Sequence, residues 1–128
     1  MAGSLLDTHA FIWYINGDSA LSSKAIEAIG ATAGNNYVSV ASLWEIAVKI
    51  SLGKLELKQL FSRVAKEIER NGFQILPIVF DDVLQVTTLP FFHKDPFDRL
   101  LVAQSITNRL QIITKDQYFI QYPIDVLW

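Results

Sequence analysis

Residues 37–48 read Tyr-Val-Ser-Val-Ala-Ser-Leu-Trp-Glu-Ile-Ala-Val, a β-prone run that leads straight into an apolar segment of helical length. The first four residues are mostly β-branched or aromatic, which predicts a short strand over 37–40. The following residues predict a helix over 42–52 that is apolar on nearly all sides, as is typical of a helix lying deep against a sheet. A buried strand followed by a buried helix is the repeating unit of an α/β fold.

The same alternation extends along the whole chain. Further β-prone runs lie at 5–6, 73–76, 110–113 and 124–127. The stretches between them predict helices over 22–29, 58–70, 81–89 and 98–108. This order predicts an α/β fold with a central, mostly parallel sheet of four or five strands, covered by helices on both faces.

Composition predicts a single domain over residues 1–128. The chain has 128 residues, of which 51% are hydrophobic and 19% are charged, so it can bury a substantial core. No apolar run approaches the ~20 residues of a membrane-spanning helix, and no basic region leads into a cleavable apolar stretch. We therefore expect a cytoplasmic protein with no membrane partner. The absence of cysteine excludes thiolate catalysis and zinc sites of the cysteine type.

Four acidic residues stand out because their surroundings are apolar. Glu45 is the only charged residue between 37 and 48, and Asp7 directly follows the first strand. Asp98 opens the helix over 98–108, and Asp116 follows the strand over 110–113. A carboxylate in an apolar segment is costly unless it is paired, hydrogen-bonded or metal-bound.

Topology assigns three of these acids to one place. The carboxyl ends of parallel strands meet at a single sheet edge, where α/β proteins bind ligands, and Asp7, Glu45 and Asp116 all belong to that edge. Asp98 precedes a strand, so on this topology we expect it at the opposite edge, unless the loop over 90–97 carries the chain back across. Four carboxylates in one crevice would require cations, and oxygen ligands favour Mg²⁺ or Mn²⁺.

Each acid also has a structural alternative. Asp7 and Asp116 would serve equally as helix N-caps, and Glu45 would form a buried ion pair with Lys49, four residues along. Asp95 is interpreted as an N-cap, because Pro96 follows it at the first helical position. The histidines, His9 and His93, suggest no metal site, and a surface or RNA-contacting position is expected for both. Gly-x-Ser-x-Gly, Walker and Gly-x-Gly-x-x-Gly motifs are absent.

Four segments together resemble one protein family. They are Leu-Leu-Asp-Thr-His at 5–9, Ser-Val-Ala-Ser-Leu-Trp-Glu-Ile at 39–46, His-Lys-Asp-Pro-Phe-Asp-Arg-Leu-Leu-Val-Ala-Gln at 93–104, and Thr-Lys-Asp-Gln-Tyr-Phe at 114–119. The sequence resembles the PIN-domain ribonucleases, specifically VapC-type toxins of toxin-antitoxin systems. The segment at 95–101, Asp-Pro-Phe-Asp-Arg-Leu-Leu, is the most specific of these matches.

The resemblance implies a PIN-like α/β/α sandwich and a metal-dependent endoribonuclease. The catalytic, metal-binding carboxylates would be Asp7, Glu45, Asp98 and Asp116, holding one or two Mg²⁺ or Mn²⁺ ions that activate a water molecule against RNA. Thr8 or Thr114 would assist as a hydroxyl. The implied partners are an RNA substrate, a cognate antitoxin protein and a second copy of the chain in a homodimer.

The net charge of the chain is compatible with an RNA substrate if the four metal-binding acids are left out of the count. The chain has 13 acidic and 11 basic residues; removing four metal-bound acids leaves 13 − 4 = 9 acidic residues, fewer than the basic ones. Five basic residues lie near the site motifs and are candidates for phosphate contacts. They are Lys49, Lys54, Lys94, Arg99 and Lys115.

Two other functions remain as alternatives. A receiver-like signalling domain also uses an acidic Mg²⁺ pocket, but it would need an acidic pair after the first strand, where Asp7 stands alone. A catalytically silent PIN-fold binding module would not need all four acids. The three Trp, eight Phe and four Tyr are many for so small a domain. Trp13-Tyr14 and Phe91-Phe92 are therefore candidates for a partner surface, with burial in the core as the alternative.

Overall fold

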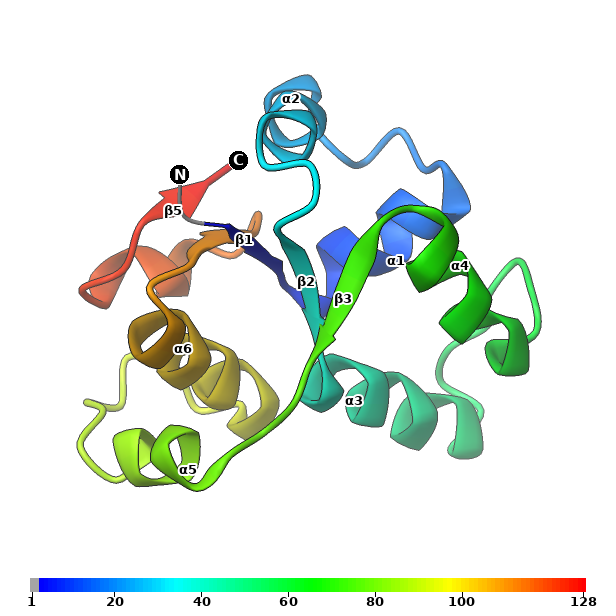
Figure 1. Cartoon of the computed structure of the whole chain (residues 1–128). Helices are drawn as coiled ribbons and strands as arrows, with labels where there is room; N and C mark the ends of the chain where they lie inside the picture. The colour runs from blue at the N-terminus through cyan, green and yellow to red at the C-terminus, as the bar shows by residue number, and fades with distance from the viewer. Residues whose placement is uncertain (1–2) are drawn as a thin grey trace.

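The computed structural model describes residues 3–128 and contains one five-stranded sheet. Every strand pairing is parallel, and the strand order is β3-β2-β1-β4-β5, as Figure 1 shows. The predicted α/β class and parallel sheet are therefore confirmed. The strands are β1 (Ser4–Leu6), β2 (Asn36–Ser39), β3 (Phe73–Leu76), β4 (Gln111–Ile113) and β5 (Val126–Leu127).

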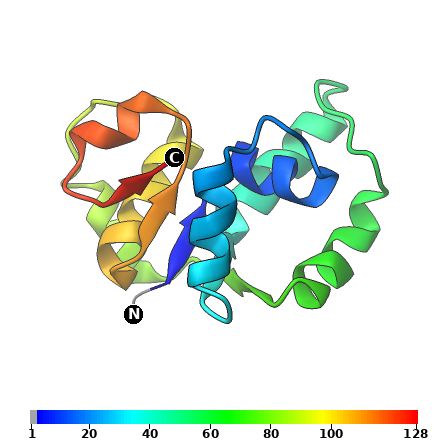
Figure 2. The ribbon, with the colours of Figure 1, turned by 90° about the horizontal axis from the view of Figure 1, so that it is seen from above.

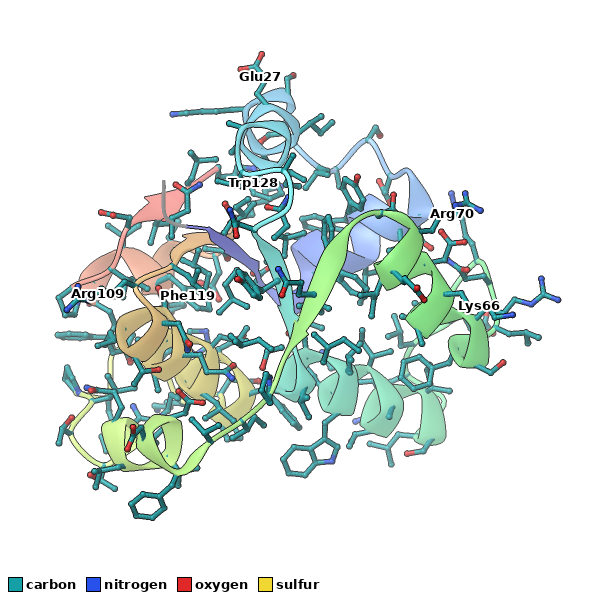
Figure 3. All side chains as sticks on the ribbon, in the orientation of Figure 1. Glu27, Lys66, Arg70, Arg109, Phe119 and Trp128 are labelled. Carbon is teal, nitrogen blue, oxygen red and sulfur yellow. The ribbon has the colours of Figure 1, made fainter. Side chains whose placement is uncertain are left out.

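Six α-helices connect and cover the strands. They are α1 (Thr8–Asn16), α2 (Ser23–Ala31), α3 (Val40–Ser51), α4 (Val64–Arg70), α5 (Phe80–Val86) and α6 (Pro96–Asn108). Two short 3-10 helices, η1 (Phe61–Arg63) and η2 (Gln117–Gln121), complete the set. Along α4 the apolar side chains Val64 and Ile68 are buried, while Lys66 and Arg70 point into solvent (Figure 3). No helix in residues 3–128 has the length and hydropathy that a membrane span requires.

The helix predicted over 58–70 begins only at Phe61. Upstream of it, Leu55 and Leu57 are half-buried while Lys54, Glu56 and Lys58 are exposed. This alternation has the period of an extended chain, so packing of the two leucines against the core overrides the helical pattern. The helices α1 and η2 were not predicted as elements; the sequence signalled only their N-caps.

Two hydrophobic cores lie on opposite faces of the sheet. On one face, Leu6, Val38 and Ile113 pack with residues of α1, α2 and α4. On the other, Leu5 and Ile112 pack with α6 and η2. Figure 2 shows α6 on one side of β1 and the helices α1 and α2 on the other. The molecule is therefore the predicted α/β/α sandwich.

Helix α6 is wedged against the sheet as predicted, whereas α3 is not fully buried. Residues 101–105 of α6 are all buried. In α3, Ala41, Ser42, Glu45 and Ile46 are buried, but Trp44 is 58% exposed. The apolar outer side of α3 therefore faces solvent in this chain, and its continuous apolar pattern had suggested otherwise.

The strand order creates a switch point between β1 and β4. From β1 the chain proceeds outward to β2 and β3, and it then returns to form β4 and β5 on the other side of β1. The connections that leave the carboxyl ends of β1 and β4 therefore diverge, and a crevice opens between them. Asp7 and Thr114 are the first residues after these two strands.

Truncating a residue of the central sheet should strongly destabilise the fold. Ile112 is fully buried on β4, and we expect Ile112→Ala to lower the free energy of unfolding by about 2–5 kcal/mol. Ile120, which is 66% exposed, provides the matched control, and Ile120→Ala should change it by less than about 0.5 kcal/mol. Urea denaturation followed by circular dichroism measures both. Equal effects of the two substitutions would contradict the assigned burial.

Candidate metal centre

Asp7 divides its two carboxylate oxygens between a helix cap and the β1–β4 switch point. Its Oδ1 accepts a hydrogen bond from the Ala10 N–H at 2.8 Å and so caps α1. Its Oδ2 accepts one from the Thr114 hydroxyl across the β1–β4 switch point. Asp7 is only 5% exposed, and this burial raises the pKa of its carboxyl, an effect that the two hydrogen bonds partly offset. The N-cap alternative is therefore correct, and it leaves the second oxygen directed at the crevice.

Glu45 is held between a hydroxyl and an ammonium group. Its Oε1 accepts from the Thr8 hydroxyl at 2.7 Å, and Thr8 also lies 3.0 Å from the Ser42 hydroxyl. Its Oε2 lies 2.8 Å from Lys49 Nζ. The ion pair that the sequence offered as an alternative is thus present, and the Lys49 side chain remains 38% exposed beside it.

Asp98 lies at the same edge as the other acids, and the expectation from topology alone was wrong. Helix α6 ends next to the start of β4, so it must run antiparallel to the strands and begin at their carboxyl edge. Asp95 caps this helix through its Oδ1, which accepts from the N–H groups of Phe97 and Asp98 at 2.8 and 3.0 Å. Asp98 itself occupies the first turn.

Asp116 completes the group and, like Asp7, divides its oxygens between two tasks. Its Oδ1 accepts from the Tyr118 N–H at 2.9 Å and caps η2. Its Oδ2 lies 2.9 Å from Nε2 of His93, and Asp98 Oδ2 lies 3.0 Å from the same nitrogen. Among residues 3–128, these three side chains form the compact set of metal-ligating groups, with their ligand atoms all within 4.8 Å of one another.

The structure corrects the assignment of His93. The sequence suggested a surface or RNA-contacting residue, but the His93 side chain is only 13% exposed and bridges two of the candidate carboxylates. One signal could have revealed it, because His93 lies two residues before the N-cap Asp95, where the chain enters the first turn of α6. His9, in contrast, is exposed as expected.

The hydrogen bonds of His93 identify its tautomer. Its Nδ1 accepts from the backbone N–H of Asp95 at 3.2 Å, so Nδ1 carries a lone pair and the proton of the neutral ring is on Nε2. The Nε2–H therefore points at Asp98 and Asp116 as a donor. In this tautomer the Nε2–H of His93 orients the two carboxylates, and Nε2 becomes a metal ligand only if the ring proton moves to Nδ1.

Electrostatics shows that the acids share one environment. The pKa of Asp98 is raised to about 8, first by burial and then by repulsion from Asp95, Glu45, Asp7 and Asp116. Asp116 likewise contributes to the raised pKa of Asp7. The group is thus deficient in positive charge, and its donor atoms are carboxylate oxygens. Both properties fit a hard divalent cation such as Mg²⁺ or Mn²⁺.

The sequence suggested Arg99 as a phosphate contact, but the structure buries its side chain. It is 6% exposed, and its guanidinium donates to the backbone carbonyls of Val86, Leu89, Pro90 and His93 at 3.0–3.4 Å. Arg99 therefore fixes the loop that leads to α6. The candidates that remain exposed are Lys54, Lys94 and Lys115.

Comparison with known proteins identifies the family. The sequence matches the PIN domain over residues 4–124, which is nearly its full length. The chain belongs to the PIN domain family. This membership rules out the receiver-like interpretation, and no curated protein matches the sequence significantly.

PIN-domain architecture recurs in several solved complexes. VapBC2 from Rickettsia felis, bound to a DNA fragment from its promoter, has a chain that superposes with a TM-score of 0.70 at 16% identity, covering 96% of both chains. A toxin-antitoxin complex from Klebsiella pneumoniae gives 0.66 at 21% identity, covering 94% of this chain and 93% of that one. For FitAcB from Neisseria gonorrhoeae the values are 0.68 and 15%, with 96% and 95% coverage. At these identities the likeness establishes the fold.

The raised pKa of Asp98 predicts a pH-dependent stability of the metal-free PIN domain. The folded state keeps this proton up to about pH 8, whereas the unfolded chain loses it near the model value of 3.8. The folded state therefore binds more protons between these values, and stability falls as pH rises through that window. In EDTA, Asp98→Asn should reduce the loss of unfolding free energy between pH 5 and 9 by about 1–3 kcal/mol.

Denaturant unfolding at a series of pH values measures this slope. Some slope should remain in the variant, because the pKa of Asp7 is raised as well. The control is Asp81→Asn, at an exposed carboxyl on α5, which should leave the profile unchanged. A profile of Asp98→Asn parallel to that of the wild type would contradict the shared environment of the acids.

Proposed function

We propose that the chain is a metal-dependent endoribonuclease and the toxin component of a toxin-antitoxin pair. The observation that carries the proposal is the gathering of Asp7, Glu45, Asp98 and Asp116 at the switch point of a PIN domain. Glu45, Asp7 and Asp116 all contribute to the raised pKa of Asp98, and such repulsion is costly in a protein that uses these acids only structurally. The cost is explained if a cation binds there.

These four carboxylates would hold one or two Mg²⁺ or Mn²⁺ ions. The bound cation would supply Lewis-acid chemistry, which polarises a phosphodiester and lowers the pKa of an attacking water. Thr8 orients Glu45, and Thr114 orients Asp7, so both predicted hydroxyl helpers have a defined task. His93 holds Asp98 and Asp116 at a fixed separation.

Asp98 has a further consequence for cation binding. Because its pKa is about 8, the metal-free protein keeps this carboxyl largely protonated at pH 7. A cation must displace that proton, so affinity should rise with pH. The exposed lysines Lys54, Lys94 and Lys115 would contact the RNA backbone around the site.

Partner chains are part of the proposal. Solved structures with this fold are described as VapBC, FitAcB and toxin-antitoxin complexes, which supports a cognate antitoxin for this chain. A homodimer is supported by apolar exposure on α5, where Phe80 is 76% exposed and Val83 and Leu84 about half exposed. Trp13 and Tyr14 pack against the core, whereas Phe91 and Phe92 are exposed.

Cleavage of RNA should require both the metal and the acids. Purified protein should cut structured and single-stranded RNAs with Mn²⁺ or Mg²⁺ and not with EDTA. Asp98→Asn should lower the rate by at least about 100-fold while the far-UV spectrum is unchanged. Asp81→Asn should cut at the wild-type rate. A metal-dependent rate that survives in Asp98→Asn would show that Asp98 acts only in the first turn of α6.

Melting temperature measures metal binding independently of cleavage. Millimolar Mn²⁺ should raise the melting temperature of the wild type by several degrees, and should raise that of Glu45→Gln and Asp116→Asn less, because each variant loses a ligand. Without metal, the same variants should melt higher than the wild type, because they remove mutual repulsion. Indifference of the wild type to metal would contradict the shared site and support a catalytically silent module.

The homodimer is tested by mass in solution. At tens of micromolar, light scattering of the isolated chain should give twice the mass of one chain, and Phe80→Glu should shift it toward the monomer because it places a charge in an apolar interface. Ile26→Glu, at a 52% exposed site on α2, is the control. A monomeric wild type at this concentration would exclude the dimer.

A further inference from the structure

Three aromatic rings are exposed beside the candidate metal centre. Phe91 is 78% exposed, Tyr118 57% and Phe92 41%. With Lys94 they line a cavity of about 320 Å³, whose remaining walls are His93 and Asp95. The His93 ring also reaches Asp98 and Asp116, and the Tyr118 N–H binds Asp116. The cavity therefore shares a wall with the carboxylate group.

Each ring is held in position by another side chain. The Arg99 guanidinium lies 4.0 Å from the centre of the Phe91 ring. Phe92 packs edge-on against the buried Tyr122, with ring centres 5.2 Å apart, and Tyr118 contacts His93 at 5.4 Å.

The backbone of this loop is fixed as well. The hydroxyl of Tyr122 donates to the Pro90 carbonyl at 2.8 Å and accepts from the His93 N–H at 2.9 Å. Arg99 binds further carbonyls of the same loop. The rings are thus preorganised while they remain open to solvent, an arrangement that core packing does not require.

The cavity is lined by one cation and one carboxylate. Asp95 uses its Oδ1 to accept from the N–H groups at the start of α6, and His93 is engaged through both ring nitrogens. Lys94 is exposed and forms no ion pair within residues 3–128. A ligand would therefore meet flat apolar faces, the Lys94 ammonium group on one side and the Asp95 carboxylate at the start of α6.

We propose that this cavity binds one unpaired nucleobase of a single-stranded RNA, with the adjoining phosphate directed toward Lys94 and the carboxylates. The proposal rests on the proposed nuclease function and deepens it by placing one base of the RNA against named side chains beside the metal centre. Aromatic rings stack on the face of any base, and a base is available for stacking only outside a duplex. The cavity volume lies near the lower end of the ~300–1,000 Å³ of ligand pockets, which suits one base and not a helix.

Binding of short RNAs separates this proposal from catalysis. The probes are a fluorescein-labelled eight-nucleotide single strand, the same strand annealed to its complement, and the same strand with one abasic position. Anisotropy is measured in Ca²⁺ buffer, with the integrity of the RNA checked on a gel. The protein should bind the single strand at least about tenfold more tightly than the duplex, and an abasic position at the bound nucleotide should weaken binding.

Four variants test the rings. Phe91→Ala and Tyr118→Ala should each weaken binding of the single strand by about tenfold. Tyr118→Phe, which keeps the ring, and Ile120→Ala, which removes an exposed apolar group outside the cavity, should bind like the wild type. Wild-type affinity in both ring-removing variants would overturn the proposal. So would unchanged RNA binding accompanied by a change in oligomeric mass, which would assign the rings to a protein interface.

The two proposals fail in different ways. If the rings are needed for RNA binding but no metal-dependent cleavage is found, the base pocket stands and the nuclease proposal fails. If cleavage depends on Asp98 while the ring-removing variants bind and cut single strands like the wild type, only the base pocket fails.

Discussion

Parallel pairing of β1 with β4 is the constraint on which the rest of the structure depends. It places the carboxyl ends of the two strands side by side while their connections diverge, so Asp7 and Thr114 meet at the opening between them. The hydrogen bond from Thr114 to Asp7 then links two parts of the chain that are 107 residues apart. Glu45, Asp98 and Asp116 reach the same place because α3, α6 and η2 begin at that edge.

Much of this arrangement could be predicted from the sequence, for a definite reason. The strands and the helices over 22–29 and 98–108 are marked by apolar residues and caps that lie close together in the sequence. The fold buries those apolar residues, so the local pattern is enough to predict these elements. Isolated carboxylates in apolar segments are visible in the same way. The orientation of α6 could also have been inferred, since a helix that feeds a parallel strand has to run antiparallel to it. Family resemblance, and not periodicity, supported Asp98.

What the sequence concealed depends on contacts between distant residues. His93 looked like a surface residue because its contact with Asp116 joins positions 23 residues apart, and its place just before the N-cap Asp95 was the one local sign of its role. Arg99 looked like a phosphate ligand because a charge beside an acidic motif is usually solvated, whereas here a loop folds over it. In the same way, Asp7 and Asp116 each required a choice between cap and ligand. In the structure each residue caps a helix with one oxygen and directs the other to a side chain of the crevice, so capping leaves the proposed ligand role open to both.

Asp98 and Arg99 are neighbours in sequence but lie in different surroundings. Asp98 faces the acids, while Arg99 reaches the carbonyls of the preceding loop and the ring of Phe91. Two consecutive residues of α6 thus link the acidic group in the crevice to the loop and the Phe91 ring beside it. Lysine at position 99 would preserve the charge but not the planar set of donors that several carbonyls require. A shift of α6 along its axis would move Asp98 away from the other acids and Arg99 away from the loop carbonyls and Phe91 at the same time. The contacts of both residues therefore restrain the first turn of α6.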